Sequence, residues 1–176
     1  KVREGIAMLD SCRRPDLVTE ITLQPVRRYG VDAAIFFSDI VVPLKAVASG
    51  WTSSRASGRD RAAVPHPRRP RPDPRAGRRH DHRHHRVVRL LTAELGATPL
   101  IGFAGAPFTL ASYLVEGGPS RDLGKTKALM YSDPQLWNDL LNRLAQISGE
   151  FLRVQVAAGA SAVQLFDSWV GASRSP

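Results

Sequence analysis

Asp39 directly follows an apolar run, and its surroundings suggest chemistry more strongly than those of any other side chain in this sequence. The run Ala33-Ala34-Ile35-Phe36-Phe37 ends in Ser38-Asp39. Burying a carboxylate beside two phenylalanines is costly unless a hydrogen-bond donor or a positive charge satisfies it. That partner could be structural, such as an arginine or a helix N-terminus, or it could be a ligand. Asp39 is therefore a candidate functional carboxylate, with the structural alternative still open.

Tyr113 and Ser168 follow two later apolar runs. Tyr113 comes in the helical pattern after the run 99–104, and Ser168 comes two residues after the run 162–166. Tyr113 could instead keep its ring in the core and its hydroxyl at the surface. Ser168 could cap the next helix, which is a common role for a serine after a strand. Asp167 is open to the same two interpretations as Ser168, and we do not assign it to the site.

These candidates need a scaffold that places successive apolar runs side by side. Short apolar runs between turn residues indicate strands that are buried on both faces, as in a parallel sheet. Helical patterns separate the runs: Pro15 to Gly30, 87–95, 107–114, 123–131, and a long helix from Pro134 to about Ala158 that Asp133 caps. This alternation predicts an α/β fold with a parallel sheet, in which ligands gather at the C-terminal ends of the strands.

The net charge of +9 comes almost entirely from one segment. Residues 51–86 hold 11 arginines and 3 aspartates, whereas the other 140 residues hold 14 Lys and Arg against 13 Asp and Glu. The segment also has all five histidines but no Ile, Leu, Met, Phe or Tyr. We expect it to be disordered, because it lacks the side chains that could bury an apolar face.

Three interpretations of this segment are open. It could be an unnatural stretch, since Arg, Pro, Ala, Gly and His are what GC-rich codons tend to give out of frame. It could be a disordered linker. It could also be an arm that binds nucleic acid, or a metal through His80, His82, His84 and His85. We favour the first, and divide the chain into 1–48, an aberrant segment 49–86, and 87–176.

Four motifs in the two patterned regions resemble the uroporphyrinogen decarboxylase family. They are Phe-Ser-Asp-Ile at 37–40, Gly-Phe-Ala-Gly-Ala-Pro-Phe-Thr-Leu at 102–110, Tyr-Leu-Val-Glu-Gly-Gly at 113–118 and Gln-Leu-Phe-Asp-Ser at 164–168. Their order and spacing also match the family, and the resemblance covers 1–48 and 87–171. It implies an incomplete TIM-type (β/α)₈ barrel, about half of a family member.

The resemblance also implies an activity and a site. The family removes carbon dioxide from the four acetate side chains of uroporphyrinogen III, giving coproporphyrinogen III, and acts as a homodimer without metal or cofactor. By resemblance, Asp39 would be the catalytic carboxylate and would also bind substrate, by accepting hydrogen bonds from the pyrrole N–H groups of the tetrapyrrole. Tyr113 and Ser168 would contact its side-chain carboxylates or orient the ring being processed.

The family's N-terminal arginines and its C-terminal half, with a site histidine, have no counterpart here. We therefore expect this chain alone to be inactive and to fold poorly, because a partial barrel leaves open sheet edges. The alternatives are a related barrel methyltransferase, which would need His and Cys metal ligands, and a basic nucleic-acid-binding protein acting through 51–86. The lone Cys12 fits a reducing compartment, and we expect a cytoplasmic protein without membrane or nucleic-acid partners.

Overall fold

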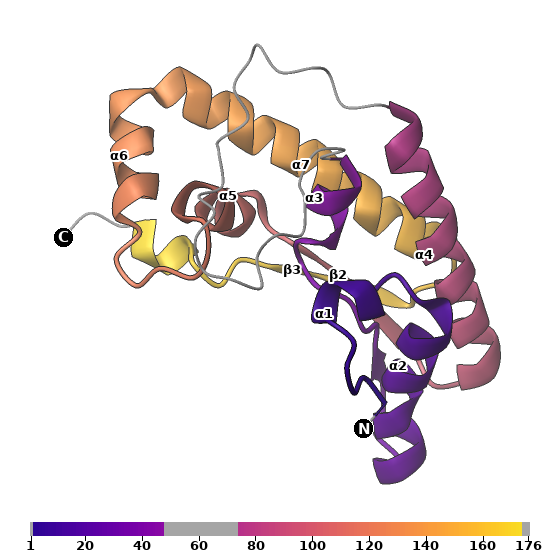
Figure 1. The fold of residues 1–176 in the computed structure, drawn as a ribbon. Helices are drawn as coiled ribbons and strands as arrows, with labels where there is room; N and C mark the ends of the chain where they lie inside the picture. The colour runs from indigo at the N-terminus through magenta and orange to yellow at the C-terminus, as the bar shows by residue number, and fades with distance from the viewer. Residues whose placement is uncertain (1, 48–73, 174–176) are drawn as a thin grey trace.

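The centre of the fold is a parallel sheet of three strands. The structure is a computed structural model that describes residues 2–47 and 74–173, with side chains for 2–44 and 84–172. The strands are β1 (Ala34–Ile35), β2 (Leu100–Gly105) and β3 (Ala162–Phe166), in the order β1-β2-β3. Both pairings are parallel, with Ala34 opposite Leu100 and Ile101 opposite Ala162. This confirms the predicted α/β class and parallel sheet (Figure 1).

Helices connect and cover these strands. In the described ranges they are α1 (Met8–Ser11), α2 (Pro15–Tyr29), α3 (Val42–Val47), α4 (Pro74–Leu95), α5 (Pro107–Glu116), α6 (Gly124–Ser132), α7 (Pro134–Ala157) and the short 3₁₀ helix η1 (Val170–Ser173). Local signals set several of their ends. Gly30 terminates α2 in the left-handed conformation, with φ of 61°. Asp133 caps α7 by accepting a hydrogen bond from the Leu136 N–H at 3.0 Å.

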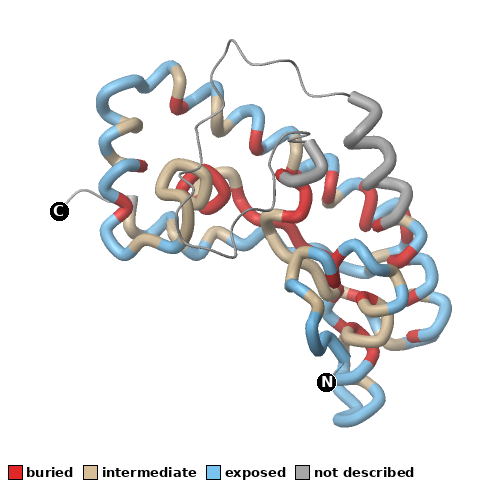
Figure 2. The backbone as a smooth tube through the Cα atoms, in the orientation of Figure 1, coloured by how far each residue is buried: buried red, intermediate tan, exposed pale blue. Residues whose placement is uncertain are grey.

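Two apolar clusters hold the sheet and helices together. One joins β1 and β2 to α2, α4 and the end of α7, with Phe36, Leu91 and Phe151 among its members. The other joins α3, α5 and α7 around Leu110 and Trp137. Figure 2 shows buried positions along β2, which lies between the other two strands.

The predicted burial of the strands on both faces is confirmed only for β2. In β1, which is shorter than predicted, Ile35 is 60% exposed. Every residue of β3 is exposed, including Val163 at 41% and Leu165 at 46%. The reason is the position of β3 in the sheet: it pairs with β2 on one side and is the last strand in the described part of the chain.

The helix predicted to begin at Val87 begins earlier, at Pro74, inside the segment where disorder was expected. The reason is the packing of the second half of this helix, residues 84–95, against the core. Once residues 84–95 pack as a helix, each further residue adds one hydrogen bond without a new nucleation cost, and arginine and alanine favour helices. His84 is 6% exposed and makes edge-to-face contacts with the rings of Phe36 and Phe151. The expectation that segment 51–86 could not bury a face and would be disordered is therefore wrong at its end, where residues 74–86 are helical and His84 packs in the core.

None of the helices in the described ranges is long and apolar enough to cross a membrane.

Candidate active site

The C-terminal ends of the three strands are held against one another. A methyl group added at Gly105 would lie 3.0 Å from Cβ of Ile40, so the chain just after Asp39 packs directly on the end of β2. The Ala106 N–H donates to the carbonyl of Phe166 at 2.7 Å, which joins the end of β2 to the end of β3. The segments that carry Asp39, Tyr113 and Ser168 therefore all start from the end of the sheet at which its parallel strands finish, as expected for a parallel fold.

Asp39 is half-buried and has a local structural partner. Its Oδ1 accepts a hydrogen bond from the Val41 N–H at 2.9 Å, and its carbonyl accepts one from the Val42 N–H at 3.0 Å at the start of α3. Oδ2 accepts no hydrogen bond from any residue of the described part of the chain. The structural role considered for Asp39 is therefore present for one of its two carboxylate oxygens.

Cys12 lies beside Asp39 and is 5% exposed. Burial, and next the nearby Asp39 carboxylate, raise the pKa of the Cys12 thiol to about 11. A thiol with that pKa is almost entirely protonated at neutral pH and is a poor nucleophile. Cys12 therefore serves as a packing residue.

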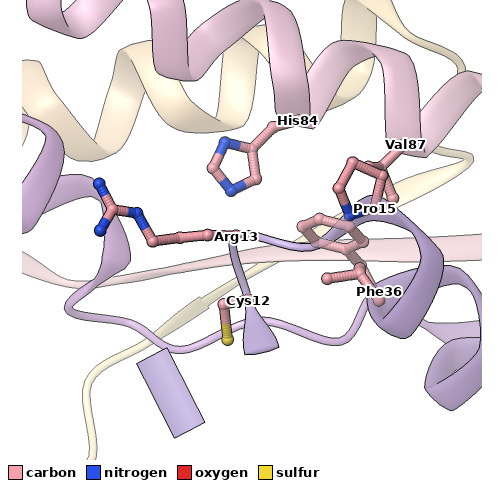
Figure 3. A pocket seen from close by; sticks show the side chains of 7 residues that line it. Cys12, Arg13, Pro15, Phe36, His84 and Val87 are labelled. Carbon is pink, nitrogen blue, oxygen red and sulfur yellow. The ribbon is translucent and has the colours of Figure 1, made fainter. Parts of the chain in front are cut away.

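A small apolar pocket lies between the start of α2 and α4. Figure 3 shows the His84 ring projecting from α4 toward Cys12 and Arg13, with Pro15, Phe36 and Val87 at its other side. Its cavity volume is about 10 Å³, room for one water molecule at most. It is far too small for a tetrapyrrole and represents loose packing around His84.

Tyr113 is half-buried on α5, and its carbonyl accepts the Gly117 N–H that closes the helix at 3.0 Å. Its ring meets the indole of Trp169 edge to face, with 6.0 Å between centroids. Because Trp169 follows Ser168 directly, this contact links the helix that carries Tyr113 to the turn that carries Ser168. The aromatic pair also fixes the orientation of the Tyr113 ring.

Ser168 lies in an exposed turn between β3 and η1. It caps no described helix: the η1 turn closes instead from the Val170 N–H to the carbonyl of Asp167, at 3.4 Å. Asp167 is half-buried, and its Oδ1 accepts a hydrogen bond from the Thr109 hydroxyl at 2.8 Å. The same hydroxyl accepts a hydrogen bond from the Trp169 N–H at 3.2 Å.

Sequence reasoning did not identify Thr109 or Trp169 as part of this region. Thr109 lies within the motif 102–110, but a single threonine in a helix gives no sign of a partner 58 residues away. The sequence held an indirect signal for this contact region: two polar residues, Asp167 and Ser168, immediately follow an apolar strand.

The histidines considered as metal ligands are only partly described. The side chains of His80 and His82 lie outside the described residues, and His84 packs in the core against Phe36 and Phe151. Within the ranges that the structure describes, no three His, Cys, Asp or Glu side chains are close enough to hold one metal ion.

The sequence was compared with known proteins. The profile described as "Uroporphyrinogen decarboxylase (URO-D)" matches residues 1–174. Three proteins named "Uroporphyrinogen decarboxylase" are similar to this chain. The protein from Streptomyces griseus subsp. griseus is 64% identical over 98% of this chain, that from Nocardioides sp. is 61% identical over 97%, and that from Thermobifida fusca is 58% identical over 98%. The matches cover 47%, 50% and 48% of those relatives.

The chain therefore spans about half the length of the curated relatives it matches. Its parallel sheet and surrounding helices agree with an incomplete (β/α)₈ barrel, the fold that the four motifs implied. A profile match over nearly every residue, together with relatives well above half identical, shows that the chain belongs to the uroporphyrinogen decarboxylase family.

Proposed function

We propose that the protein to which this chain corresponds decarboxylates the four acetate side chains of uroporphyrinogen III to give coproporphyrinogen III, without a metal or organic cofactor. The observation that carries this proposal is the 64% identity, over 98% of the chain, to a protein named "Uroporphyrinogen decarboxylase". The proposal extends to a homodimer in the cytoplasm, by the same resemblance. The activity belongs to the whole protein, since the chain matches 47% of that relative.

The chemistry explains why a fixed carboxylate is needed. Breaking the bond between the acetate methylene and its carboxylate leaves an electron pair that has no favourable place to go. Protonating a carbon of the pyrrole ring first creates a cationic acceptor for that pair. After carbon dioxide leaves, protonation of the methylene gives a methyl group, and loss of the proton first added to the ring carbon restores the pyrrole. A carboxylate held in an apolar site stabilises the cation better than water does, because screening there is weak.

Asp39 suits this role in three respects. It stands at the C-terminal end of β1, where ligands of parallel α/β folds gather. Its Oδ1 is held by the Val41 N–H, which restricts the side chain, whereas Oδ2 accepts no hydrogen bond from described residues. The pyrrole N–H groups of the macrocycle would then donate to this oxygen, and each charge-assisted bond contributes about 1.5–3 kcal/mol.

Tyr113 and Ser168 take the complementary role in this proposal. Both carry hydroxyl donors, and the Tyr113–Trp169 contact keeps them at one edge of the sheet. Hydroxyl donors suit the propionate and acetate carboxylates at the periphery of the macrocycle, or the orientation of the ring undergoing reaction.

The test uses a full-length enzyme, which we call the repaired chimera. It takes residues 1–48 and 87–171 from this chain and all other parts, including the segment that matches 49–86, from the Streptomyces griseus relative. We expect it to release carbon dioxide from uroporphyrinogen III and to form coproporphyrinogen III. A folded repaired chimera that converts none of this substrate would contradict the proposal.

We further propose that segment 49–86 is not a natural part of the protein. A second chimera that retains residues 49–86 of this chain separates this proposal from the first. We expect the second chimera to be inactive and the repaired chimera to be active. Equal activity of the two would contradict the proposal, because the segment would then be compatible with a working enzyme.

A further inference from the structure

One buried hydroxyl in this structure holds the residues on both sides of Ser168. Thr109 is 1% exposed, in the first turn of α5. It donates to Oδ1 of Asp167 at 2.8 Å and accepts from the Trp169 N–H at 3.2 Å. A threonine hydroxyl donates one hydrogen bond and can accept others, so it makes both bonds at once: it donates to the carboxylate and accepts from the backbone N–H. Ser168 lies between the two residues that Thr109 binds.

The helix that supplies this hydroxyl also carries Tyr113. Thr109 and Tyr113 are four residues apart, so they stand one turn apart on the same side of α5. The Tyr113 ring contacts Trp169 at 6.0 Å between centroids. Two independent contacts, one polar and one aromatic, thus tie α5 to the turn after β3.

We propose that Thr109 and Asp167 are positioning residues that fix the separation of Tyr113 and Ser168. This fixed separation strengthens the binding of the substrate's side-chain carboxylates. This inference rests on the proposed function. Neither residue touches substrate in this account: the hydroxyl of Thr109 is committed to its two partners, and Asp167 acts through Thr109.

The inference predicts a specific kinetic signature. The propionates, and the acetates of rings that are not reacting, are held equally before and during bond breaking, so loosening their contacts weakens binding without slowing the chemical step. In the repaired chimera we expect Thr109→Val, which keeps the shape but removes the hydroxyl, to raise KM about tenfold and to change kcat less than about threefold. Thr109→Ser restores the hydroxyl and should return KM to within about twofold of the parent.

A purely structural role predicts a different result. If Thr109→Val merely reduces the folded fraction, there is less active enzyme and the apparent kcat falls while KM stays constant. Ser112→Ala is the matched control, because Ser112 is 2% exposed on the same helix and its hydroxyl donates to the carbonyl of Phe108, within that helix, at 2.9 Å. We expect its KM to equal that of the parent.

Several outcomes would overturn the inference. They are a KM for Thr109→Val within about twofold of the parent, a failure of Thr109→Ser to restore KM, or an equal rise in Ser112→Ala. If Thr109→Val does not fold, Asp167→Ala removes the acceptor at a half-buried position, and an unchanged KM there refutes the inference. The unsubstituted repaired chimera separates the two proposals: if it converts no uroporphyrinogen III, the proposed function fails, whereas an active chimera whose KM is unchanged by Thr109→Val refutes only the positioning role.

Discussion

Replacing Gly102 with alanine should destabilise the fold through a single buried side chain, Gln155. A Cβ at Gly102 would lie 2.5 Å from Oε1 of Gln155, closer than nonbonded atoms can approach. Gln155 is fully buried on α7 and cannot move aside freely. Its Oε1 accepts from the Phe103 N–H at 3.0 Å, and its Nε2 donates to the carbonyls of Phe103 at 3.0 Å and Phe151 at 3.1 Å.

The sheet explains why these bonds matter. The Phe36 N–H donates to the carbonyl of Ile101, so every second residue of β2 points its backbone groups toward β1. Phe103 is the next residue that points this way, but β1 ends at Ile35 and offers it no partner. The amide of Gln155 satisfies both backbone groups of Phe103 in place of a strand.

The magnitude follows from the groups that would be left unpaired. Leaving a buried donor or acceptor unsatisfied costs about 1–3 kcal/mol. Displacing Gln155 affects at least the two backbone groups of Phe103, which is 7% exposed. We therefore expect Gly102→Ala to lower the free energy of unfolding by about 3 kcal/mol, and Gln155→Ala by about 3–5 kcal/mol.

A double-mutant cycle in the repaired chimera, followed by urea denaturation, tests this account. With Gln155→Ala already present, the clashing amide is gone, and the new methyl at Gly102 should cost less than about 1 kcal/mol. Gly149→Ala is the control, since a Cβ added at this exposed glycine of α7 would meet nothing within 4 Å among the described residues beyond its own stretch of helix. It should stabilise the protein by up to about 1 kcal/mol. Strictly additive effects of Gly102→Ala and Gln155→Ala would refute the reasoning.

Three further predictions concern stability. Burial raises the pKa of the Cys12 thiol from about 9 in the unfolded chain to about 11 in the folded one. The stability that the protonated thiol contributes is therefore intact below pH 9 and is lost as the pH rises through 11, by at most about 3 kcal/mol. Urea denaturation at several pH values should show this fall in the free energy of unfolding, and Cys12→Ala should make the profile flatter. Asp133→Ala should lower the free energy of unfolding by about 1 kcal/mol, because it removes the α7 cap. Asp139→Ala, at an exposed carboxylate that accepts a hydrogen bond from the Gln135 side-chain amide, should lower it by less than about 0.5 kcal/mol. A larger loss at Asp139 than at Asp133 in thermal melts would contradict this. Leu165→Lys should increase the soluble fraction of the 176-residue chain, because it places a charge on the exposed strand β3. In the repaired chimera it should lower the melting temperature, because the completed barrel buries that side chain. A melting temperature of the repaired chimera that does not fall would be evidence against the barrel.

Features that depend on neighbouring residues were predicted well from the sequence. Gly30 ends α2 because glycine adopts the left-handed conformation without strain, and Asp133 begins α7 because its carboxylate binds a free backbone N–H. The apolar run after Pro99 forms β2 as predicted, because it combines strand-forming residues with turn signals on both sides.

Features that depend on distant partners were not predictable in this way. The exposure of β3 follows from its place at the end of the sheet, which its own residues do not encode. The early start of α4 depends on the packing of His84 against Phe36 and Phe151. Asp39, Tyr113 and Ser168 could be named from their motifs. The hydroxyl that links their elements could not, because Thr109 meets Asp167 only once the two strand ends stand side by side.

The role of Asp39 is the central claim, and the turnover of Asp39→Asn in the repaired chimera tests it most directly. Asparagine keeps an oxygen that can accept the Val41 N–H, so the start of α3 should be preserved while the negative charge is removed. We predict that kcat for the release of carbon dioxide from uroporphyrinogen III falls at least about a hundredfold, with little change in the melting temperature. A kcat within about threefold of the parent enzyme would contradict the account, because a neutral side chain would then serve the reaction as well as the carboxylate.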